Sequence, residues 1–227
     1  MGRYCVIIPA LEAADTIGEL VGRIKRHGLA VVVVDDGSRD ATAAMASQAG
    51  AVVISHLRNH GKGCALRTGF AYALRSRYDG IVTMDSDGQH DPDDLPRLLQ
   101  TGESSRAGMV VGNRLANGRA MPTVRRWTNE LMSWMVSGVA GVGIPDSQCG
   151  FRFIRREVLE SLTLRAVGFE IETELLLAAA ARRWPIVSVP VRTIYGREQS
   201  RIQPARDTAR FVGVMTRHLL QRGRNGV

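Results

Sequence analysis

Short apolar runs alternate with longer stretches of helical periodicity through the first half of the chain. The apolar runs predict strands at residues 4–9, 30–34, 51–54, 80–84 and 109–111. Between them, helical spacing predicts helices at residues 14–27, 40–49, 62–77 and 92–101. This alternation is typical of an α/β fold with a mostly parallel central sheet flanked by helices. No repeat or linker segment interrupts the chain, so we expect a single domain.

Residues 121–142 follow a different pattern, an amphipathic stretch with two faces. The apolar face carries aromatic and aliphatic residues at helical spacing: Trp127, Leu131, Trp134, Met135 and Val139. The other face repeats every four residues: Arg125, Asn129, Ser133 and Ser137. Two interpretations stay open, a helix packed against the sheet or an interfacial helix with tryptophans at the depth of lipid headgroups. Residues 204–222 predict a terminal helix with a basic end.

The charge of the chain points to a polyanionic partner. Its net charge is +8 and its pI is about 10.2, which suits nucleic acid, an anionic membrane surface or phosphate-bearing substrates. Aromatic residues make up only 5% and no RNA-recognition pattern occurs, so we expect no nucleic-acid partner. Arginine heavily outnumbers lysine, a bias that phosphate binding favours and that a GC-rich genome would also produce.

The lack of recognisable targeting signals and the spacing of the cysteines predict a cytoplasmic protein. No apolar run reaches 18 residues, so we expect no transmembrane helix. The N-terminus has the pattern of a strand and not of a signal peptide. Cys5, Cys64 and Cys149 lie far apart without a CxxC motif, which predicts reduced thiols and neither a zinc site nor a disulfide.

The most informative segment is IVTMDSDGQHD at residues 81–91. A strand-like run leads directly into Asp85-Ser86-Asp87. Hard cations such as Mg²⁺ and Mn²⁺ prefer carboxylate oxygens and usually share their site with substrate phosphates. Because ligands of open α/β sheets bind beyond the carboxyl ends of the strands, we expect a divalent ion and a diphosphate-bearing substrate here.

Other strand ends carry polar residues as well. Asp35-Asp36 follow the second strand, and Asp36 is our candidate for hydrogen bonds to a ribose or base. His60-Gly61-Lys62-Gly63 opens a helix but lacks P-loop spacing. Lys62 and the helix amides could bind an anion, or the segment is a glycine-rich turn with a surface lysine. Arg114 follows the fifth strand, and it is either a contact to a phosphate or an ordinary surface arginine.

Seven blocks, which run in order from residue 6 to about residue 202, together resemble a known family. They are VIIPALEA (6–13), VVDDGSRDAT (33–42), NHGKGCALRTGF (59–70), MDSDGQHDPDDLP (84–96), VVGNR (110–114), DSQCGFRFIRREVL (146–159) and GFEIETELL (168–176). The ordered set resembles the family 2 glycosyltransferases, in particular the dolichol- or polyprenyl-phosphate mannosyltransferase-like branch. The resemblance implies a single-domain GT-A fold over residues 1–227. Residues 1–115 would form the nucleotide-sugar-binding half, residues 116–203 the acceptor half, and residues 204–227 a terminal helix and basic tail.

The resemblance also implies roles for individual residues. Nucleotide contacts fall on Pro9, Glu12 and Asp36, and Lys62 joins these donor-binding candidates. Metal contacts fall on Asp85, Asp87 and Gln89, while Arg114 would contact the diphosphate. Acceptor contacts fall on Arg125, Asn129 and Arg201. The expected catalytic set is Asp85, Asp87, Arg114 and Arg125. The chain departs from the family pattern where Arg201 replaces a lysine and Ser188 replaces a glutamate.

The function that follows is a metal-dependent, inverting transfer of a hexose, mannose or glucose. The donor would be a nucleotide-diphospho-sugar, the cofactor Mg²⁺ or Mn²⁺, and the acceptor a polyprenyl phosphate. The alternative is a hydroxyl acceptor on a glycan, lipid or small molecule, which requires a base. Asp146 is the first candidate for that base, followed by Glu174. Some relatives continue into transmembrane helices, so we expect peripheral contact at the inner face of the cell membrane or a membrane-anchored partner subunit.

Overall fold

The computed structural model describes residues 2–116, 121, 123–194 and 204–225. Among these, the side chains of Arg125 and of residues 204–205 and 221–225 are not described. Arg201 therefore lies outside the described residues, and so does the side chain of Arg125. No helix in the described part of the chain is long and apolar enough to cross a membrane.

The first half follows the predicted alternation of strands and helices. Its elements are β1 (Tyr4–Ala10), α1 (Ala14–Lys25), β2 (Ala30–Asp35), α2 (Thr42–Gln48), β3 (Val52–Ser55), α3 (Lys62–Arg75), β4 (Gly80–Thr83), the 3₁₀ turn η1 (Pro92–Asp94), α4 (Leu95–Ser105) and β5 (Met109–Asn113). The predicted strand bounds lie within two residues of those observed. In α1, Ile17, Leu20, Val21 and Ile24 are buried at the spacing that the sequence pattern predicts.

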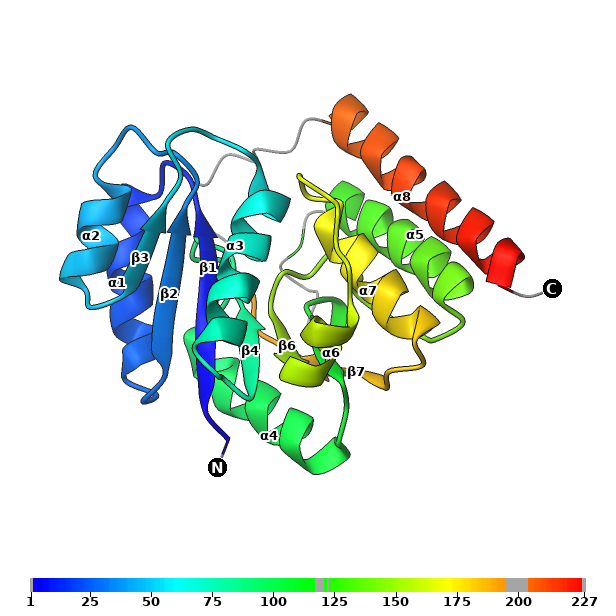
Figure 1. Ribbon diagram of the computed structural model, residues 1–227, viewed down its shortest axis with the longest axis horizontal. Helices are drawn as coiled ribbons and strands as arrows, with labels where there is room; N and C mark the ends of the chain where they lie inside the picture. The colour runs from blue at the N-terminus through cyan, green and yellow to red at the C-terminus, as the bar shows by residue number, and fades with distance from the viewer. Residues whose placement is uncertain (1, 117–120, 122, 195–203, 226–227) are drawn as a thin grey trace.

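The second half adds elements that the apolar pattern did not predict. After the helix α5 (Thr123–Ala140), these additional elements are β6 (Arg152–Arg155), α6 (Arg156–Ser161), α7 (Ile171–Ala181) and β7 (Ile186–Pro190). The predicted terminal helix is α8 (Pro204–Asn225). Figure 1 shows α5, α7 and α8 gathered at one end of the molecule, away from α1 and α2.

The described strands form one seven-stranded sheet in the order β3-β2-β1-β4-β6-β5-β7. All neighbours pair in parallel except β6, which runs antiparallel to both β4 and β5. The mostly parallel sheet is therefore confirmed. Because β6 is reversed, Arg152 at its start pairs with Thr83 at the end of β4. The loop before β6 consequently reaches the same sheet edge as the carboxyl ends of β1, β2, β4 and β5.

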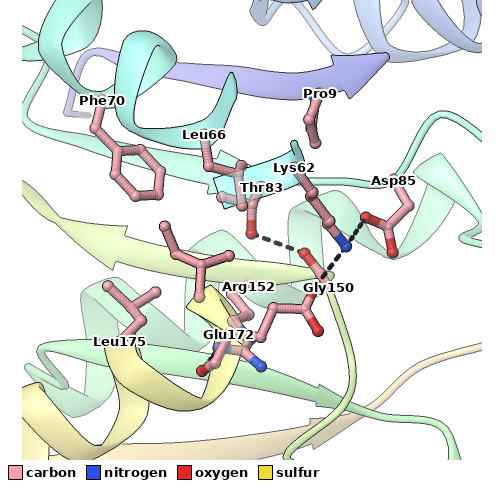
Figure 2. Close-up of a pocket in the computed structure, with 11 residues that line it drawn as sticks. Pro9, Lys62, Leu66, Phe70, Thr83, Asp85, Gly150, Arg152, Glu172 and Leu175 are labelled. Carbon is pink, nitrogen blue, oxygen red and sulfur yellow. Dashed lines mark hydrogen bonds and ion pairs between the residues drawn. The ribbon is translucent and has the colours of Figure 1, made fainter. Parts of the chain in front are cut away.

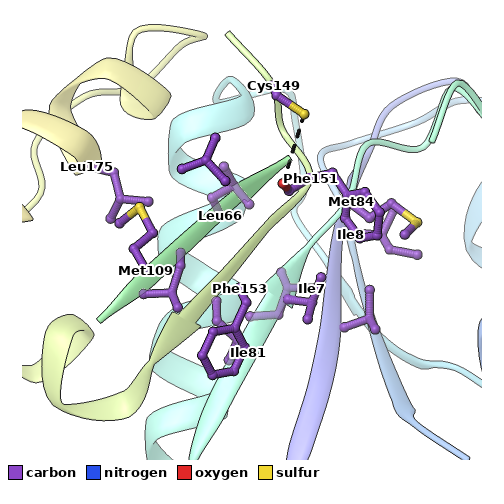
Figure 3. Packing of buried hydrophobic residues seen from close by; sticks show 14 of the residues in the cluster. Ile7, Ile8, Leu66, Ile81, Met84, Met109, Cys149, Phe151, Phe153 and Leu175 are labelled. Atoms are coloured by element: carbon purple, nitrogen blue, oxygen red, sulfur yellow. Dashed lines mark hydrogen bonds between the residues drawn. The ribbon is translucent and has the colours of Figure 1, made fainter. Parts of the chain in front are cut away.

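The core lies between this sheet and its helices (Figure 3). Ile7, Ile81, Met109 and Phe153 come from four adjacent strands and are at most 1% exposed. Leu66 of α3 and Leu175 of α7 pack in the same cluster. Packing of the sheet fixes the positions of the strand ends, and with them the positions of the residues that follow each strand.

The three cysteines are free, as predicted. Cys5 and Cys149 are fully buried, and burial raises the pKa of each thiol to about 12. Both behave as small packing residues that stay protonated near neutral pH.

Candidate active site

The carboxyl edge of the sheet brings together residues from distant parts of the chain. Figure 2 shows a pocket at this edge, between the end of β1, the start of α3, the end of β4 and the start of α7. Its lining comprises Pro9, Lys62, Leu66, Phe70, Thr83, Asp85, Gly150, Arg152, Ile171, Glu172 and Leu175. The candidates Pro9, Lys62 and Asp85 therefore share one site.

Lys62 is the electrostatic centre of this pocket. Its Nζ lies 2.6 Å from Asp85 Oδ1 and 2.6 Å from Glu172 Oε1. On the other side of Asp85, His90 Nε2 lies 3.5 Å from Oδ2. Burial opposes ionisation of Asp85, but Lys62 and His90 outweigh it and hold the pKa of that carboxyl well below its usual value. Burial likewise disfavours the ammonium of Lys62, yet Asp85 and Glu172 raise its pKa. Asp85 and Lys62 are therefore both charged at neutral pH.

Glu172 is a site residue that the sequence reasoning missed. It lies in the first turn of α7, and its side chain is only 9% exposed. The block GFEIETELL gave one signal, glutamates at the start of a largely apolar helix, but it did not indicate which of them has a partner. That partner is Lys62, which lies 110 residues earlier in the chain.

Gly150 makes room for the carboxylate of Asp85. A Cβ at Gly150 would lie 2.5 Å from Asp85 Oδ2, closer than any side chain tolerates. The carbonyl of Gly150 accepts a hydrogen bond from Thr83 Oγ1 at 2.7 Å, which fixes the glycine beside the end of β4. The loop before β6 thus forms one wall of the carboxylate site.

The residues fit a divalent ion that is shared with substrate. Within the described residues no group of three or more His, Cys, Asp or Glu side chains could hold a metal by itself. Asp87 Oδ1 accepts a hydrogen bond from the amide of Gln89 at 3.0 Å, which shapes the turn after β4. Mg²⁺ commonly binds through one or two carboxylates plus substrate phosphates, so a closed protein cage is not required. The ammonium of Lys62 shows that Asp85 already accepts a cation.

Asp36 is held by groups within the protein. Its carboxylate, 4% exposed, accepts hydrogen bonds from the amides of His60 at 3.0 Å and Gly61 at 2.7 Å, and it contacts His56 Nδ1 at 2.6 Å. Both oxygens are thus engaged within the protein. Asp36 therefore holds the loop before α3, and its contact with a ribose or base stays a prediction.

Glu12 lies in the loop after β1, at the carboxyl edge of the sheet. It adopts a positive φ of 44°, and its carboxylate accepts a hydrogen bond from the amide of Arg39 at 2.7 Å. The carboxylate therefore joins the loops that follow β1 and β2.

Two amides at the start of α3 are engaged within the protein. Gly61 donates its N–H to Asp36 and Asn59, and Gly63 donates to the carbonyl of Val167 at 2.9 Å. A Cβ at Gly63 would lie 2.5 Å from the carbonyl oxygen of Ala166, which explains the glycine there. The ammonium of Lys62 remains as the positive group of this segment.

Arg114 and Asp146 form a buried bidentate pair. Arg114 Nε and Nη2 lie 2.8 and 2.9 Å from the two carboxylate oxygens of Asp146, and the Arg114 amide adds a bond of 3.1 Å. Arg114 is 7% exposed and Asp146 is fully buried. Burial opposes the charge of Arg114, but the hydrogen bonds that it donates to Asp146 raise its pKa. Arg114 is therefore oriented by Asp146 and not exposed on the surface.

This pair also changes the role of the candidate bases. Asp146 is a buried structural anion and not an accessible base. Glu174 accepts hydrogen bonds from the amides of Arg165 at 2.9 Å and Ala166 at 2.8 Å, so it fixes the loop before α7. Neither carboxylate is free to take a proton from a hydroxyl acceptor.

The helix α5 buries its polar face. Asn129 and Ser133 are 8% and 3% exposed, and Ser133 Oγ accepts a hydrogen bond from the amide of Ser147 at 2.8 Å. Trp127 and Trp134 point outward instead, with 71% and 72% exposure. The interpretation that this apolar face packs against the sheet is therefore wrong for its tryptophans. Asn129 lies 3.8 Å from Met121 Sδ and has no described contact with the Asp85 pocket.

Sequence and structure comparisons identify the family. The family model described as Glycosyl transferase family 2 matches residues 5–163. The chain is 33% identical over 207 residues to the polyprenol monophosphomannose synthase of Mycolicibacterium smegmatis, which covers 83% of this chain and 76% of that protein. It is 31% identical over 204 residues to the undecaprenyl-phosphate mannosyltransferase of Micrococcus luteus, with coverage of 83% and 82%.

A solved structure supports the fold. Glucosyl-3-phosphoglycerate synthase of Mycobacterium tuberculosis, in complex with uridine diphosphate, superposes with a TM-score of 0.75 at 23% identity, and the match covers 96% of this chain and 80% of that one. With the seven-stranded sheet, this likeness confirms the expected GT-A architecture. The chain belongs to glycosyl transferase family 2, on its dolichol/polyprenyl-phosphate branch, and is a glycosyltransferase.

Proposed function

We propose that this enzyme transfers a hexose, mannose or glucose, from a nucleotide-diphospho-sugar to a polyprenyl phosphate, with inversion at the anomeric carbon. The outward apolar face of α5 carries this proposal, because an exposed row of large apolar side chains suits a lipid-borne acceptor. Relatives named for polyprenol and undecaprenyl phosphate support the same acceptor class.

The donor side rests on the Asp85 pocket. Asp85 and Asp87, with Gln89, would hold Mg²⁺ or Mn²⁺, and a related fold has been crystallised with Mn²⁺ and uridine diphosphate. When bound, the ion would neutralise the diphosphate and stabilise the departing nucleoside diphosphate. Pro9 and Glu12 are our candidates for contacts to the nucleotide, and Lys62, which lines the same pocket as Pro9, would add a positive charge beside its phosphates.

The state of the carboxylates favours a phosphate acceptor. A phosphate monoester is already ionised near pH 7, so it can attack without a general base. A hydroxyl acceptor would need one, and both Asp146 and Glu174 are occupied by internal hydrogen bonds. The hydroxyl acceptor therefore stays the weaker alternative.

We assign the acceptor to the second half of the molecule. Arg125 and Asn129 lie one turn apart on α5, and with Arg201 they are our candidates for the lipid phosphate. The loop that forms one wall of the Asp85 site is also bonded to α5, through Ser147 and Ser133. Donor and acceptor regions, residues 1–115 and 116–203, would meet at this loop, while α5 and the net charge of +8 would hold the enzyme peripherally at a membrane or beside a membrane-anchored partner.

A donor panel tests this proposal. Purified protein is incubated with polyprenyl phosphate in detergent and radiolabelled GDP-mannose or UDP-glucose, with Mg²⁺, Mn²⁺ or EDTA. We expect label in the organic phase with one donor, loss of transfer in EDTA, and loss in the Asp87→Asn variant. Asp93→Asn is the matched control, because Asp93 lies on the surface with 54% exposure. Full transfer in EDTA or in Asp87→Asn would refute the metal assignment.

A further inference from the structure

We propose that Lys62 is a resident counter-ion that competes with the divalent ion for Asp85 and makes binding of that ion and of the nucleoside diphosphate mutually dependent. This inference rests on the proposed metal site at Asp85. It goes beyond that site because it assigns Lys62 a role in the order and coupling of binding.

The geometry of Lys62 is that of a cation shared between two acids. Its Nζ is equidistant, at 2.6 Å, from one oxygen of Asp85 and one of Glu172 (Figure 2). The side chain of Lys62 is 13% exposed, and those of Asp85 and Glu172 are 26% and 9% exposed. The ring centre of Phe169 lies 5.4 Å from Nζ and screens the group further. In this low-dielectric site each carboxylate depends on the ammonium for its charge balance.

The backbone of Lys62 is fixed while its side chain has freedom. Gly61 and Gly63 on either side of it pack against the backbone of residues 166–168. The amide of Gly63 is bonded there as well, to Val167. The flexible four-carbon stem of lysine can still rotate about this fixed point.

An ammonium 2.6 Å from Oδ1 disfavours a divalent ion on the same carboxylate, because the two positive charges repel each other. Lys62 would therefore release Asp85 when the ion binds. Glu172 would then hold the ammonium nearby. The buried guanidinium of Arg152 cannot take its place, because it already donates hydrogen bonds to the backbone carbonyls of Ser147, Cys149 and Glu172. Lys62 would thus pivot on Glu172 and not leave the site.

The diphosphate completes this exchange. Phosphate oxygens that bind the ion beside Asp85 offer the released ammonium a new acceptor. Without them, the ion has to displace Lys62 with no compensation, so binding of the ion alone is weak. Such coupling is reciprocal, and each ligand strengthens binding of the other by the same factor, roughly tenfold or more.

The first experiment measures Mn²⁺ binding by electron paramagnetic resonance of the free ion, with and without UDP or GDP, and corrects for Mn²⁺ bound by the nucleotide itself. In the wild type we expect the nucleotide to strengthen Mn²⁺ binding roughly tenfold. Lys62→Met should bind Mn²⁺ several-fold more tightly without nucleotide and lose most of the coupling. The matched control is Lys25→Met, because Lys25 is the only other lysine of the chain and binds the carbonyl of Gly50 away from the site.

The outcomes separate this inference from the proposed function. Wild-type protein that binds no Mn²⁺ under any condition would overturn both. Mn²⁺ binding that Asp87→Asn abolishes but Lys62→Met leaves unchanged would overturn the counter-ion role alone.

A second measurement uses the wild type, in case Lys62→Met leaves Glu172 unpaired and fails to fold. Protein with ¹³C-labelled lysine gives ε-methylene NMR signals from two residues only, and Lys25→Met assigns them. We expect Mg²⁺ and UDP together to shift the Lys62 signal and to leave the Lys25 signal in place. A Lys62 signal that does not move at saturating Mg²⁺ and UDP would contradict the proposal.

Discussion

At the scale of single residues, the role of Asp146 as a buried clamp for Arg114 can be tested against that of a general base. As a buried clamp for Arg114 it should be needed for stability, since its removal leaves a guanidinium unpaired at 7% exposure. We expect Asp146→Ala to lower the free energy of unfolding by about 3–5 kcal/mol, measured by urea denaturation. Unchanged stability combined with lost turnover would contradict the clamp and restore the general-base hypothesis.

Gly150 offers a second test at this scale. A methyl group there would overlap Asp85 Oδ2, so the carboxylate must move. We expect Gly150→Ala to reduce kcat/KM by about 10²-fold, because small displacements of catalytic groups have effects of that size. Gly22→Ala in α1 is the control, because a Cβ at that position would meet no other atom within 4 Å. Full activity in Gly150→Ala would show that the position of Asp85 is not critical.

The residues of the site were predictable to different extents. The acids at the strand ends followed from the sequence alone, because parallel strands end at one edge. Their partners did not follow. Lys62 and Glu172 are 110 residues apart and meet only after α3 and α7 have packed. Asp36 is an acid at a strand end like Asp85, and nothing local showed that three groups of residues 56–61 would occupy it.

At the scale of elements, α5 shows why amphipathicity does not determine which face is buried. Ser133 and Ser137 find hydrogen-bond partners in the loop at residues 144–147, so the polar face can pack inward. The helical pattern of residues 121–142 therefore predicted the element and left its orientation open.

The exposed tryptophans of α5 predict a measurable affinity for membranes. We expect the double variant Trp127→Ser/Trp134→Ser to bind anionic phosphatidylglycerol vesicles at least about tenfold more weakly in sedimentation, because it loses large apolar surface for insertion. The control is Met45→Gln, since Met45 is exposed on α2 at 39%. Equal binding of the double variant and the control would exclude α5 as the membrane surface.

Strands differed in how well the sequence revealed them. The buried parallel strands β1 and β2 are continuous apolar runs, which the pattern detects directly. The antiparallel β6 begins and ends with arginine, and Arg152 is nevertheless only 1% exposed. Its guanidinium donates hydrogen bonds to three backbone carbonyls, and these bonds offset the cost of burying the charge. The arginines made the strand look exposed in the sequence.

At the scale of the whole molecule, the sheet makes a single folding unit of the two proposed halves. β6 and β7 belong to the second half but pair with β4 and β5 of the first. All three tryptophans lie in the second half, and Trp184 donates its indole N–H to Ser161 at 3.0 Å. We expect urea transitions followed by tryptophan fluorescence and by far-ultraviolet circular dichroism to coincide. Separated midpoints would show two independent domains.

The central claim concerns the acceptor, and two lipids that differ only in the phosphate test it directly. The enzyme, Mn²⁺ and the labelled donor are incubated with polyprenyl phosphate or with the polyprenol of equal length, and label in the organic phase is measured. We predict transfer to the phosphate and none to the alcohol, because the two candidate bases, Asp146 and Glu174, are engaged in internal hydrogen bonds. Transfer to the alcohol at an equal or higher rate would contradict it.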